Sequence, residues 1–508
     1  MTQADVLIVG AGPTGLALAL WLDAQGARVR IIDKSSGPGA TSRAMVVQAR
    51  TLELYRQLDL ADGVIAGGHK TEGLQIWTNG KRRATIAFMD AGEDITPYPY
   101  VLIYPQDLHE RFLVERLAAR GIVVERETEL LDFVDQGTGV EARVRLPDGS
   151  EAKCRARYLA GCDGARSTVR HVLGAGFEGG TYEQLFYVAD VDGKSSLSNG
   201  EINISFEGPD FVLVAPYGEP GKLRFVGTVL PERVGGAGTL TFEDVGLGAV
   251  RALDIEVEKV NWFSTYHVHH RVTDRFRHGN VFLLGDAAHV HSPAGGQGMN
   301  TGIGDSINLA WKLAAVIKGE APDSLLDSYE AERAVFARKL VETTDRAFTF
   351  VTARGSFAEF VRTRIAPIFA KIAYGFEPTR EMIFRLVSQT MISYPESPLS
   401  AGTAGKVSGG DRLPFVRVDG KDNYEPLAAI GWQVHVYGEA KPELAAWCET
   451  RAIALRVFGW TERHGAAGLQ RDAAYLLRPD TYVALAEPSA DVPPLERYFQ
   501  ERGFVTTG

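Results

Sequence analysis

Glycines near the N-terminus form the first stretch whose residue types and spacing predict chemistry. Gly10, Gly12 and Gly15 have the spacing G-x-G-x-x-G and follow the apolar run Val6–Val9. The first glycine permits a tight turn, the second lets the backbone approach a pyrophosphate, and the third lets the next helix lie close to the strand. Asp33 ends the following apolar run, about 20 residues further on, where an acid accepts hydrogen bonds from a ribose. The stretch predicts an adenine-dinucleotide site and does not by itself distinguish FAD from NAD.

Two later stretches repeat the pattern of a buried strand that ends in a turn. Residues 158–170 run from an apolar segment into Asp163-Gly164, and Ser167 can cap the helix that follows. Residues 281–302 run into Gly285-Asp286 and then into a glycine-rich turn, with a helix expected over 303–317. Such a turn lets backbone N–H groups meet an anionic or carbonyl-rich ring edge without obstruction by side chains.

The elements that position these stretches are of three kinds. Residues 71–100 and 177–272 alternate apolar and polar positions in short segments, which is typical of antiparallel strands. Residues 104–113 predict a helix, and Ile122–Glu125 predicts a further strand. After a mixed helical region, residues 409–508 alternate strands with helices, which indicates a small α/β domain. We therefore expect an α/β fold with a Rossmann-like domain, an interleaved antiparallel sheet for a second ligand, and a C-terminal domain.

Composition limits the classes of partner. The chain has 508 residues, enough for about three domains. Its net charge of −10 argues against nucleic acid or an anionic membrane as the main partner. Cys154, Cys162 and Cys448 are too few and too scattered for a disulfide framework or a zinc site. With no signal peptide and no apolar run of about 18 residues, we expect a cytoplasmic protein.

Several polar residues have more than one interpretation. Arg43 lies in a turn near the dinucleotide fold and is either a cofactor contact or a solvated arginine. His267 and His269 share one face of a predicted strand, but no third ligand is placed by spacing, so we expect no metal site. A substrate base cannot be chosen among Tyr217, Tyr266 and His267 from the sequence.

The three stretches together resemble the class A, single-component FAD-dependent aromatic hydroxylases, the monooxygenase family of which 4-hydroxybenzoate hydroxylase is the prototype. The resemblance rests on Gly10 to Gly15, on Asp163-Gly164 with Arg166, and on Gly285-Asp286-Ala-Ala-His289 followed by Pro293. The run 295–300 and Arg478-Pro-Asp480 are more similar to the branch of phenol, 3-(3-hydroxyphenyl)propionate and polyketide hydroxylases. That branch carries a C-terminal thioredoxin-like domain; here it lacks a C-x-x-C motif, so we expect it to be redox-inert.

The resemblance implies a set of cofactor residues and a domain plan. The residues expected at FAD are Gly10, Gly12, Pro13, Thr14, Gly15, Asp33, Lys34, Arg43, Gln106, Asp163, Gly164, Gly285, Asp286, Pro293, Gly296, Gly298, Met299 and Asn300, of which Pro293 and Arg43 are also expected to serve catalysis. The implied domains are a discontinuous glutathione reductase-type FAD domain (1–70, 101–175 and 276–340), a substrate sheet (71–100 and 176–275), a helical connection (341–398) and the thioredoxin-like domain (399–508).

The chemistry implied by the resemblance belongs to the cofactor. NADPH or NADH, bound transiently, reduces FAD, oxygen adds to give a flavin C4a-hydroperoxide, and one oxygen atom is inserted into a phenolic or polyketide-like ring. The implied partners are a small aromatic substrate, O2 and NAD(P)H, without metal, nucleic acid or membrane, in a monomer or homodimer. Two alternatives stay open: a flavoenzyme of the same fold that oxidises or epoxidises a non-phenolic substrate, or a non-catalytic flavin-binding protein.

Overall fold

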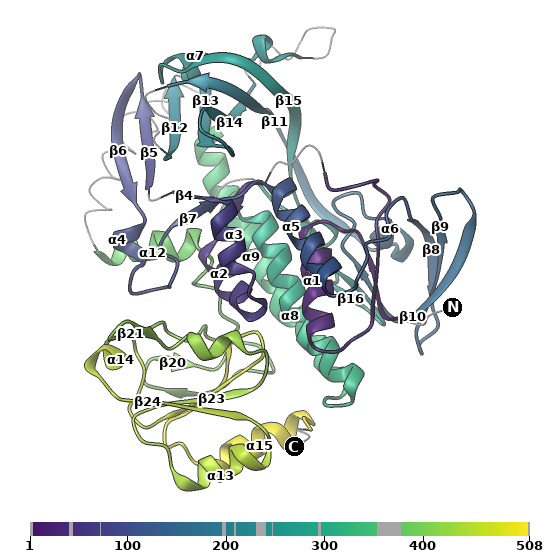
Figure 1. Cartoon of the computed structure of the whole chain (residues 1–508), viewed down its shortest axis with the longest axis vertical. Coiled ribbons are helices and arrows are strands. Elements are labelled where there is room, and N and C mark those ends of the chain that lie inside the picture. The colour runs from purple at the N-terminus through teal and green to yellow at the C-terminus, as the bar shows by residue number, and fades with distance from the viewer. Residues whose placement is uncertain are drawn as a thin grey trace.

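Three units make up the molecule (Figure 1). Helices lie at the centre with a parallel sheet beside them, a curved sheet lies at one end, and a compact α/β unit that contains the C-terminus lies at the other. The computed structural model describes residues 4–39, 44–71, 73–195, 200–207, 210–229, 240–245, 247–292, 296–352 and 377–505.

The central sheet has the strand order β16-β17-β10-β1-β2, and a β8-β9 hairpin extends from β10. Its strands are β1 (Ala4–Val9), β2 (Val29–Ile32), β8 (Glu129–Asp135), β9 (Val140–Arg145), β10 (Glu151–Gly161), β16 (Arg277–His278) and β17 (Val281–Leu283). β1, β2, β10 and β17 are mutually parallel, with Val9 opposite Gly161 and Gly161 opposite Leu283. The carboxyl ends of three strands therefore meet at one edge, which is where open α/β sheets bind ligands.

Helices bury this sheet. The apolar run of β1 is almost completely buried, as expected for a parallel strand covered on both faces. α1 packs against α5 and α8, so it is apolar nearly all round. The helices of this unit are α1 (Pro13–Ala24), α2 (Ala49–Tyr55), η1 (Arg56–Leu58), α3 (Ala61–Gly67), α5 (Gln106–Ala119), α6 (Thr168–Leu173), η4 (Gly285–Ala287), α8 (Gly298–Lys318), η6 (Asp323–Leu326) and α9 (Asp327–Thr352). A small sheet of β3 (Val46–Val47), β7 (Val101–Ile103) and β4 (His69–Thr71) lies beside them.

The second sheet has the order β18-β15-β11-β14-β13-β12-β5-β6. Its strands are β5 (Gly73–Thr78), β6 (Lys81–Ala87), β11 (Phe177–Lys194), β12 (Ile202–Glu207), β13 (Asp210–Pro216), β14 (Lys222–Thr228), β15 (Glu256–Thr273) and β18 (His289–Val290). All neighbours are antiparallel except β5 and β12, which corrects the expectation of a wholly antiparallel sheet. The short helices η3 (Phe242–Asp244) and α7 (Gly248–Arg251) cover the face that carries the buried Phe225.

The C-terminal unit has its own sheet, with the order β20-β19-β26-β25-β23-β24. Its elements are β19 (Ala401–Ala404), β20 (Val407–Ser408), β21 (Arg417–Val418), β22 (Lys421–Asp422), η8 (Glu425–Ala428), β23 (Gln433–Tyr437), α13 (Pro442–Thr450), β24 (Ala454–Phe458), α14 (Glu462–Ala466), β25 (Ala474–Leu477), β26 (Val483–Glu487) and α15 (Val492–Arg502). α12 (Glu377–Val387) precedes it, and α4 (Met89–Gly92) lies against α12.

Two expected boundaries are wrong for tertiary reasons. Ile122–Glu125 is not a strand, because only Glu125 bridges to Ile32, and Val123 remains 72% exposed at the sheet edge. α8 begins at Gly298 rather than at residue 303. Glycine occurs inside this helix because the helix packs closely on its neighbours. A Cβ at Gly302 would lie 2.3 Å from Oγ1 of Thr14.

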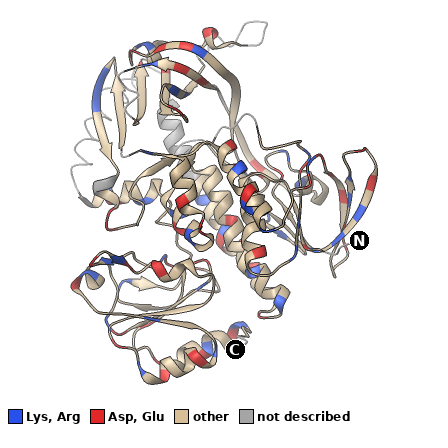
Figure 2. Cartoon of the chain, in the orientation of Figure 1, with Lys and Arg blue, Asp and Glu red and all other residues tan. Residues whose placement is uncertain are grey.

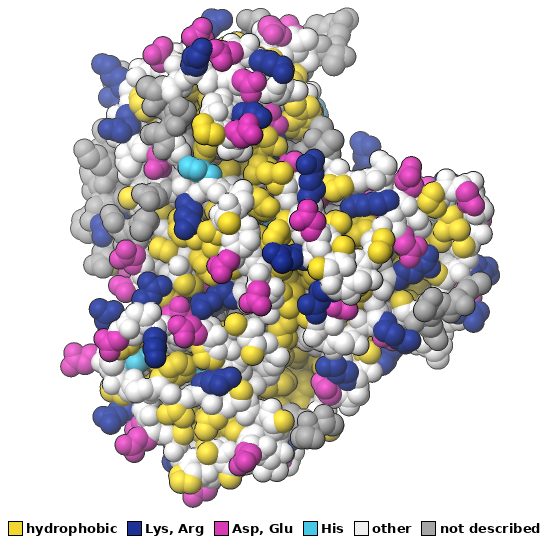
Figure 3. Space-filling model, viewed as in Figure 1, with side chains coloured by type: hydrophobic (Ala, Val, Ile, Leu, Met, Phe, Trp, Pro, Cys, Tyr) yellow, Lys and Arg dark blue, Asp and Glu magenta, His cyan; other side chains and the backbone are white. Residues whose placement is uncertain are grey.

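Charge is distributed without a dominant sign. Figure 2 shows Lys and Arg interspersed with Asp and Glu over all three units. In the space-filling view of the same face, hydrophobic side chains show between charged groups of both signs (Figure 3). Within the described residues, no helix is long and apolar enough to cross a membrane, and no cluster of His, Cys, Asp and Glu has the arrangement of a metal site.

Candidate cofactor site

Two of the three glycines in the turn after β1 have no room for a side chain, and the third has room for one. Gly10 has a φ of +104°, and a Cβ there would lie 2.3 Å from the carbonyl oxygen of Cys162. A Cβ at Gly15 would lie 2.0 Å from the carbonyl oxygen of Gly10. At Gly12, no heavy atom of the described chain, apart from those of the adjacent residues, lies within 4 Å of such a Cβ. The fold itself requires Gly10 and Gly15, whereas Gly12 leaves a space in front of α1.

This space lies at the positive end of α1. Gly12 is the N-cap residue, Pro13 is the first helical residue, and no side chain of the described residues caps the helix. A helix N-terminus offers unpaired N–H groups and the positive end of the helix dipole. Thr14, in the first turn, supports the loop from behind by accepting at its carbonyl oxygen a 2.7 Å hydrogen bond from Oγ of Ser306. The arrangement suits a phosphate group.

Asp33 is fixed beside the glycine turn. Its Oδ2 accepts a hydrogen bond from the N–H of Ala11 at 2.7 Å, and its Oδ1 accepts one from the N–H of Ser35 at 2.7 Å. Nη1 of Arg126 lies 3.8 Å from Oδ1. These contacts hold the carboxylate at the end of β2, next to the space in front of α1, while the neighbouring Lys34 is exposed.

Asp163 follows β10 at the same sheet edge. Its Oδ2 accepts a hydrogen bond from the N–H of Val169 at 3.1 Å, in the first turn of α6. Ser167 caps that helix by accepting from the N–H of Arg170, as the sequence predicts. Burial raises the pKa of Asp163, and its Oδ1 is buried without a hydrogen-bond partner among the described residues. Gly164, with a φ of +77°, makes the turn between them.

The turn after β17 packs directly against α1. Gly285 has a φ of +56°, and a Cβ there would lie 2.7 Å from Oγ1 of Thr14. The N–H of Gly285 donates a 3.0 Å hydrogen bond to Oδ2 of Asp305. Asp286 is exposed in η4, at the edge where the three strands end. The structure therefore brings together the glycine turn, Asp163 and Asp286, although the chain separates them widely.

Four of the expected site residues lie in or just before the first turn of α8, and they differ in what surrounds them. A Cβ at Gly296 would lie 2.9 Å from Val46, one at Gly298 would lie 3.8 Å from Nε2 of His291, and Met299 packs on the core. Asn300 is buried, and its Oδ1 accepts from the N–H of Gln48 and the hydroxyl of Thr51. Its Nδ2 donates to the carbonyl oxygens of Val46 and Gly296. The Asn300 side chain thus joins α8 to β3 and to the start of α2, and only its backbone is left for a ligand.

Gln106 begins α5 and faces Glu110. Its Nε2 donates a 2.8 Å hydrogen bond to Oε1 of Glu110, whose Oε2 accepts from the N–H of Gly39. Burial raises the pKa of Glu110. Two further expected residues, Arg43 and Pro293, lie outside the described residues.

Two buried groups were missed by the sequence reasoning. Nε2 of His291 has no hydrogen-bond partner among the described residues, and burial lowers the pKa of this histidine to about 4. Arg224 of β14 is completely buried and pairs with both oxygens of Asp190 at 2.6 and 2.7 Å, yet its Nη1 has no described partner. The orphaned Nη1 of Arg224 is a donor, whereas Nε2 of the neutral His291 is an acceptor, because Nδ1 donates to the carbonyl oxygen of Ser292 at 2.9 Å. Orphaned buried polar atoms of this kind fit a ligand. The only signal in the sequence is a single arginine or histidine within an apolar strand or loop.

The candidate bases are dispersed. The hydroxyl of Tyr217 donates to Oδ1 of Asp107 at 3.3 Å, and burial raises the pKa of Tyr217 to about 12. Tyr266 packs on Phe186, and His267 is exposed with its Nδ1 3.3 Å from the carbonyl oxygen of Tyr182. Only Tyr217 lies where the second sheet meets α5.

The sequence matches the family described as FAD binding domain over residues 3–344. It is 38% identical over 422 residues to 6-methylpretetramide 4-monooxygenase of Streptomyces rimosus, covering 80% of this chain and 72% of that protein. This chain belongs to the class A FAD-dependent aromatic hydroxylases. A flavin-dependent monooxygenase of Mycobacteroides abscessus is 36% identical over 497 residues and matches 95% of this chain and 97% of its own length.

Two solved structures superpose on nearly the whole of this chain. The anhydrotetracycline hydroxylase OxyS from Streptomyces rimosus superposes with a TM-score of 0.77 at 28% identity, covering 98% of this chain and 99% of its own. BexE, described with oxidation during BE-7585A biosynthesis, superposes with a TM-score of 0.76 at 28% identity and covers all of both chains. The resemblance stated from the three motifs is confirmed, and the protein is an FAD-dependent monooxygenase.

Proposed function

We propose that this monooxygenase hydroxylates a phenolic or polyketide-like aromatic ring, with NADPH or NADH as reductant. The observation that carries the proposal is the meeting of three strand ends at one edge, which brings Asp163 and Asp286 to the same edge as the open space at Gly12. The names of the relatives support the substrate class, since they include monooxygenases of pentachlorophenol and of anhydrotetracycline.

The residues present fit FAD. The N–H groups of α1 and the space at Gly12 suit its pyrophosphate, and Asp33 suits the adenosine ribose. Asp286 suits the ribityl chain, and the backbone of the first turn of α8, from Gly298 to Asn300, suits the flavin ring. When bound, FAD accepts hydride from NAD(P)H and activates O2 for transfer of one oxygen atom to the ring. The contributions of Arg43, Pro293, Lys34 and Gln106 remain proposals from the family motif.

The protein's own part is to orient the ring and keep water out. The buried Arg224 and the partly buried Tyr217 lie where the second sheet meets α5, and the Arg224 guanidinium lies 4.0 Å from the centre of the Tyr217 ring. The orphaned Nη1 of Arg224 is a donor that an oxygen of a bound substrate can accept. We infer that the aromatic substrate binds on this face of the sheet, where burial strengthens polar contacts and excludes water.

We also infer the domain plan and the nature of the C-terminal unit. The FAD domain is 1–70, 101–175 and 276–340, the substrate domain is 71–100 and 176–275, the helical connection is 341–398, and 399–508 is a thioredoxin-like domain without C-x-x-C. What supports the last assignment is the order β23-α13-β24-α14-β25-β26-α15, with β23 parallel to β24 and antiparallel to β25. A monomer or homodimer fits this plan.

A substrate panel tests the function. Purified protein is given simple phenols, 3-(3-hydroxyphenyl)propionate and multi-ring polyketide phenols, and NADH and NADPH oxidation, oxygen uptake, peroxide and product mass are followed together. We expect a product heavier by one oxygen atom, with oxygen and NAD(P)H consumed in equal amounts. Oxygenation of only non-phenolic compounds would support the same-fold alternative, and bound FAD without any NAD(P)H oxidation would support a non-catalytic flavoprotein.

A further inference from the structure

A buried carboxylate, Asp305 of α8, lies directly behind the turn that carries Asp286. Its Oδ2 accepts hydrogen bonds from the N–H of Gly285 at 3.0 Å and from Nε2 of His289 at 2.8 Å. Its Oδ1 accepts a hydrogen bond from Nε of Arg333 at 2.6 Å. Because the side chain is fully buried, these donors offset the penalty of removing its charge from water. One carboxylate therefore joins α8, the turn after β17 and α9.

Arg333 extends this junction to the first turn of α8. Its Nη2 donates to the carbonyl oxygen of Thr301 at 3.1 Å, and its Nη1 donates to the hydroxyl of Tyr394 at 2.7 Å. Gly304 makes room for the guanidinium, since a Cβ there would lie 3.2 Å from Nη2. Burial opposes ionisation of Asp305, but Arg333 and His289 outweigh it and lower the pKa of the carboxyl. The pair is therefore an ion pair inside the core.

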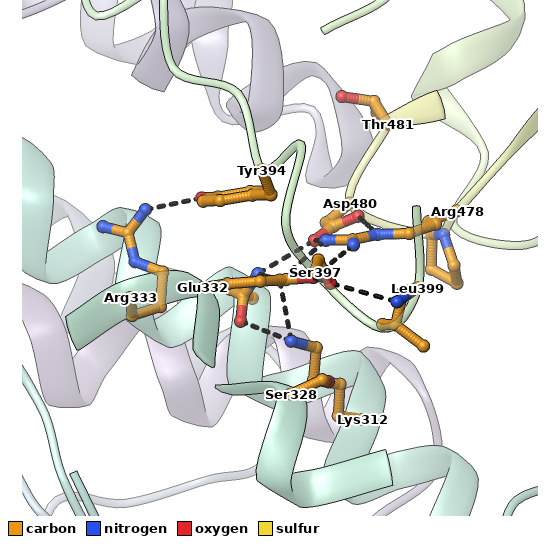
Figure 4. A network of polar contacts seen from close by, with 12 residues as sticks. Lys312, Ser328, Glu332, Arg333, Tyr394, Ser397, Leu399, Arg478, Asp480 and Thr481 are labelled. Atoms are coloured by element: carbon orange, nitrogen blue, oxygen red, sulfur yellow. Dashed lines mark hydrogen bonds and ion pairs between the residues drawn. The ribbon is translucent and has the colours of Figure 1, made fainter. Parts of the chain in front are cut away.

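The residue beside Arg333 on α9 is anchored to the C-terminal unit (Figure 4). Oε1 of Glu332 accepts from Nη1 of Arg478 and from the hydroxyl of Ser397, both at 2.6 Å. Oε2 accepts from Nζ of Lys312 at 2.8 Å, and Arg478 also pairs with Asp480 at 2.6 Å. Tyr394, which reaches Arg333, lies in the segment that leads into the same unit.

We propose that Asp305 and Arg333 are positioning residues that hold the Gly285-Asp286 turn and the first turn of α8 in the geometry that retains FAD. Tyr394 contacts Arg333 directly, and Glu332, the neighbour of Arg333 in the chain, joins α9 to the C-terminal unit through Arg478. The inference rests on the proposed cofactor site. Neither residue contacts the cofactor, because both are buried and every polar atom of each has a protein partner.

Asp305→Asn tests the inference with little change in volume. An amide has one acceptor oxygen and a donating NH2, so it cannot accept hydrogen bonds from Gly285, His289 and Arg333 together. We expect the Kd for FAD, measured by titration of apoprotein with flavin fluorescence, to rise about tenfold or more, with a shift of the visible flavin spectrum. A lower Tm of the apoprotein with an unchanged Kd and spectrum would show a purely structural role and overturn the inference.

A milder pair of variants decides the question if Asp305→Asn does not fold. Tyr394→Phe removes the hydroxyl that accepts from Arg333, and Tyr498→Phe removes an equally buried hydroxyl that donates to the carbonyl oxygen of Leu399 at 2.7 Å. We expect the Kd for FAD to rise about threefold in the first variant and to stay unchanged in the second. Equal effects of the two variants would overturn the inference.

Asp286→Ala separates this inference from the proposed site itself. If Asp286→Ala leaves the Kd for FAD unchanged, the site assignment fails and the inference fails with it. If Asp286→Ala weakens FAD binding while Asp305→Asn and Tyr394→Phe do not, the site stands and the positioning role is refuted.

Discussion

Gly12→Val separates the cofactor role of the glycine turn from its role in folding. The backbone at Gly12 has φ −77° and ψ −179°, an extended conformation that valine adopts readily. Apart from the adjacent residues, no described heavy atom lies within 4 Å of a Cβ at this position, so the valine side chain starts in open space. The loss of unfolded-state entropy favours the variant by about 0.4–1 kcal/mol, while valine is a poorer N-cap than glycine. The stability of the apoprotein should therefore change by no more than about 1 kcal/mol.

The effect on FAD should be large. The valine side chain fills the space through which a pyrophosphate would reach the first N–H groups of α1. Each charge-assisted hydrogen bond contributes about 1.5–3 kcal/mol, so the loss of two weakens binding by about 3–6 kcal/mol. This free energy corresponds to a Kd raised by a factor of about 10² to 10⁴.

Gly15→Ala is the matched control, because the same motif supplies it and the structure predicts the opposite behaviour. A Cβ at Gly15 would lie 2.0 Å from the carbonyl oxygen of Gly10, so the backbone itself must move. We expect Gly15→Ala to lower the Tm of the apoprotein clearly and Gly12→Val to shift it by no more than about 4 °C. The assays are thermal unfolding of the apoprotein and FAD titration. Wild-type affinity for FAD in Gly12→Val would refute the assignment of this space to the pyrophosphate.

Four further predictions follow from the site and its surroundings. Asp286→Ala should weaken FAD binding by about 1.5–3 kcal/mol in a titration, through loss of an acceptor at the ribityl chain. Cys448→Ser should leave turnover unchanged, because Cys448 is a free, buried thiol whose pKa burial raises to about 11. Burial lowers the pKa of His109 and of His435 to about 3, so the unfolded chain binds more protons than the folded chain below pH ~6.5. The free energy of unfolding should therefore fall from pH ~6.5 towards pH ~4, by up to about 1.4 kcal/mol per pH unit for each histidine. His109→Gln should flatten the profile of Tm against pH. A true substrate should speed anaerobic flavin reduction by NAD(P)H in stopped-flow absorbance, since it biases the flavin towards the conformation that the nicotinamide reaches; equal rates with and without substrate would remove that model.

The sequence predicts elements that depend on local patterns. Each of the three motifs is a strand, a turn and a helix within a short stretch, so hydrophobic periodicity and glycine spacing are enough to place them. Ser167 as the cap of α6 is confirmed for the same reason. Their meeting at one sheet edge follows from parallel pairing, because the carboxyl ends of neighbouring strands then coincide.

The sequence does not predict features set by contacts between distant residues. Glycines suggested a loop before residue 303, but close packing on Thr14 and Arg333 selects glycine inside α8, at Gly302 and Gly304. Asn300 was expected at the flavin, and its amide is taken up by Gln48, Thr51, Val46 and Gly296. Local sequence around Asn300 contains no sign of these partners.

The buried charged residues show most clearly which features a sequence pattern does not predict. Charged residues of a helix are usually expected on its solvated face. Four charged residues of α8 and α9 are nevertheless buried: Asp305, Lys312, Glu332 and Arg333. Buried ion pairs are weak evidence for stability, since hydrophobic residues of similar volume often stabilise as well. A pair such as Asp305 with Arg333 differs from such residues in direction, because each hydrogen bond fixes an orientation. Removing either partner would leave the other as an unpaired charge in the core, which is costly. The hydrogen bonds of the pair therefore hold the turn that carries Asp286 in one position. That directional constraint is what a site assembled from three distant strand ends requires.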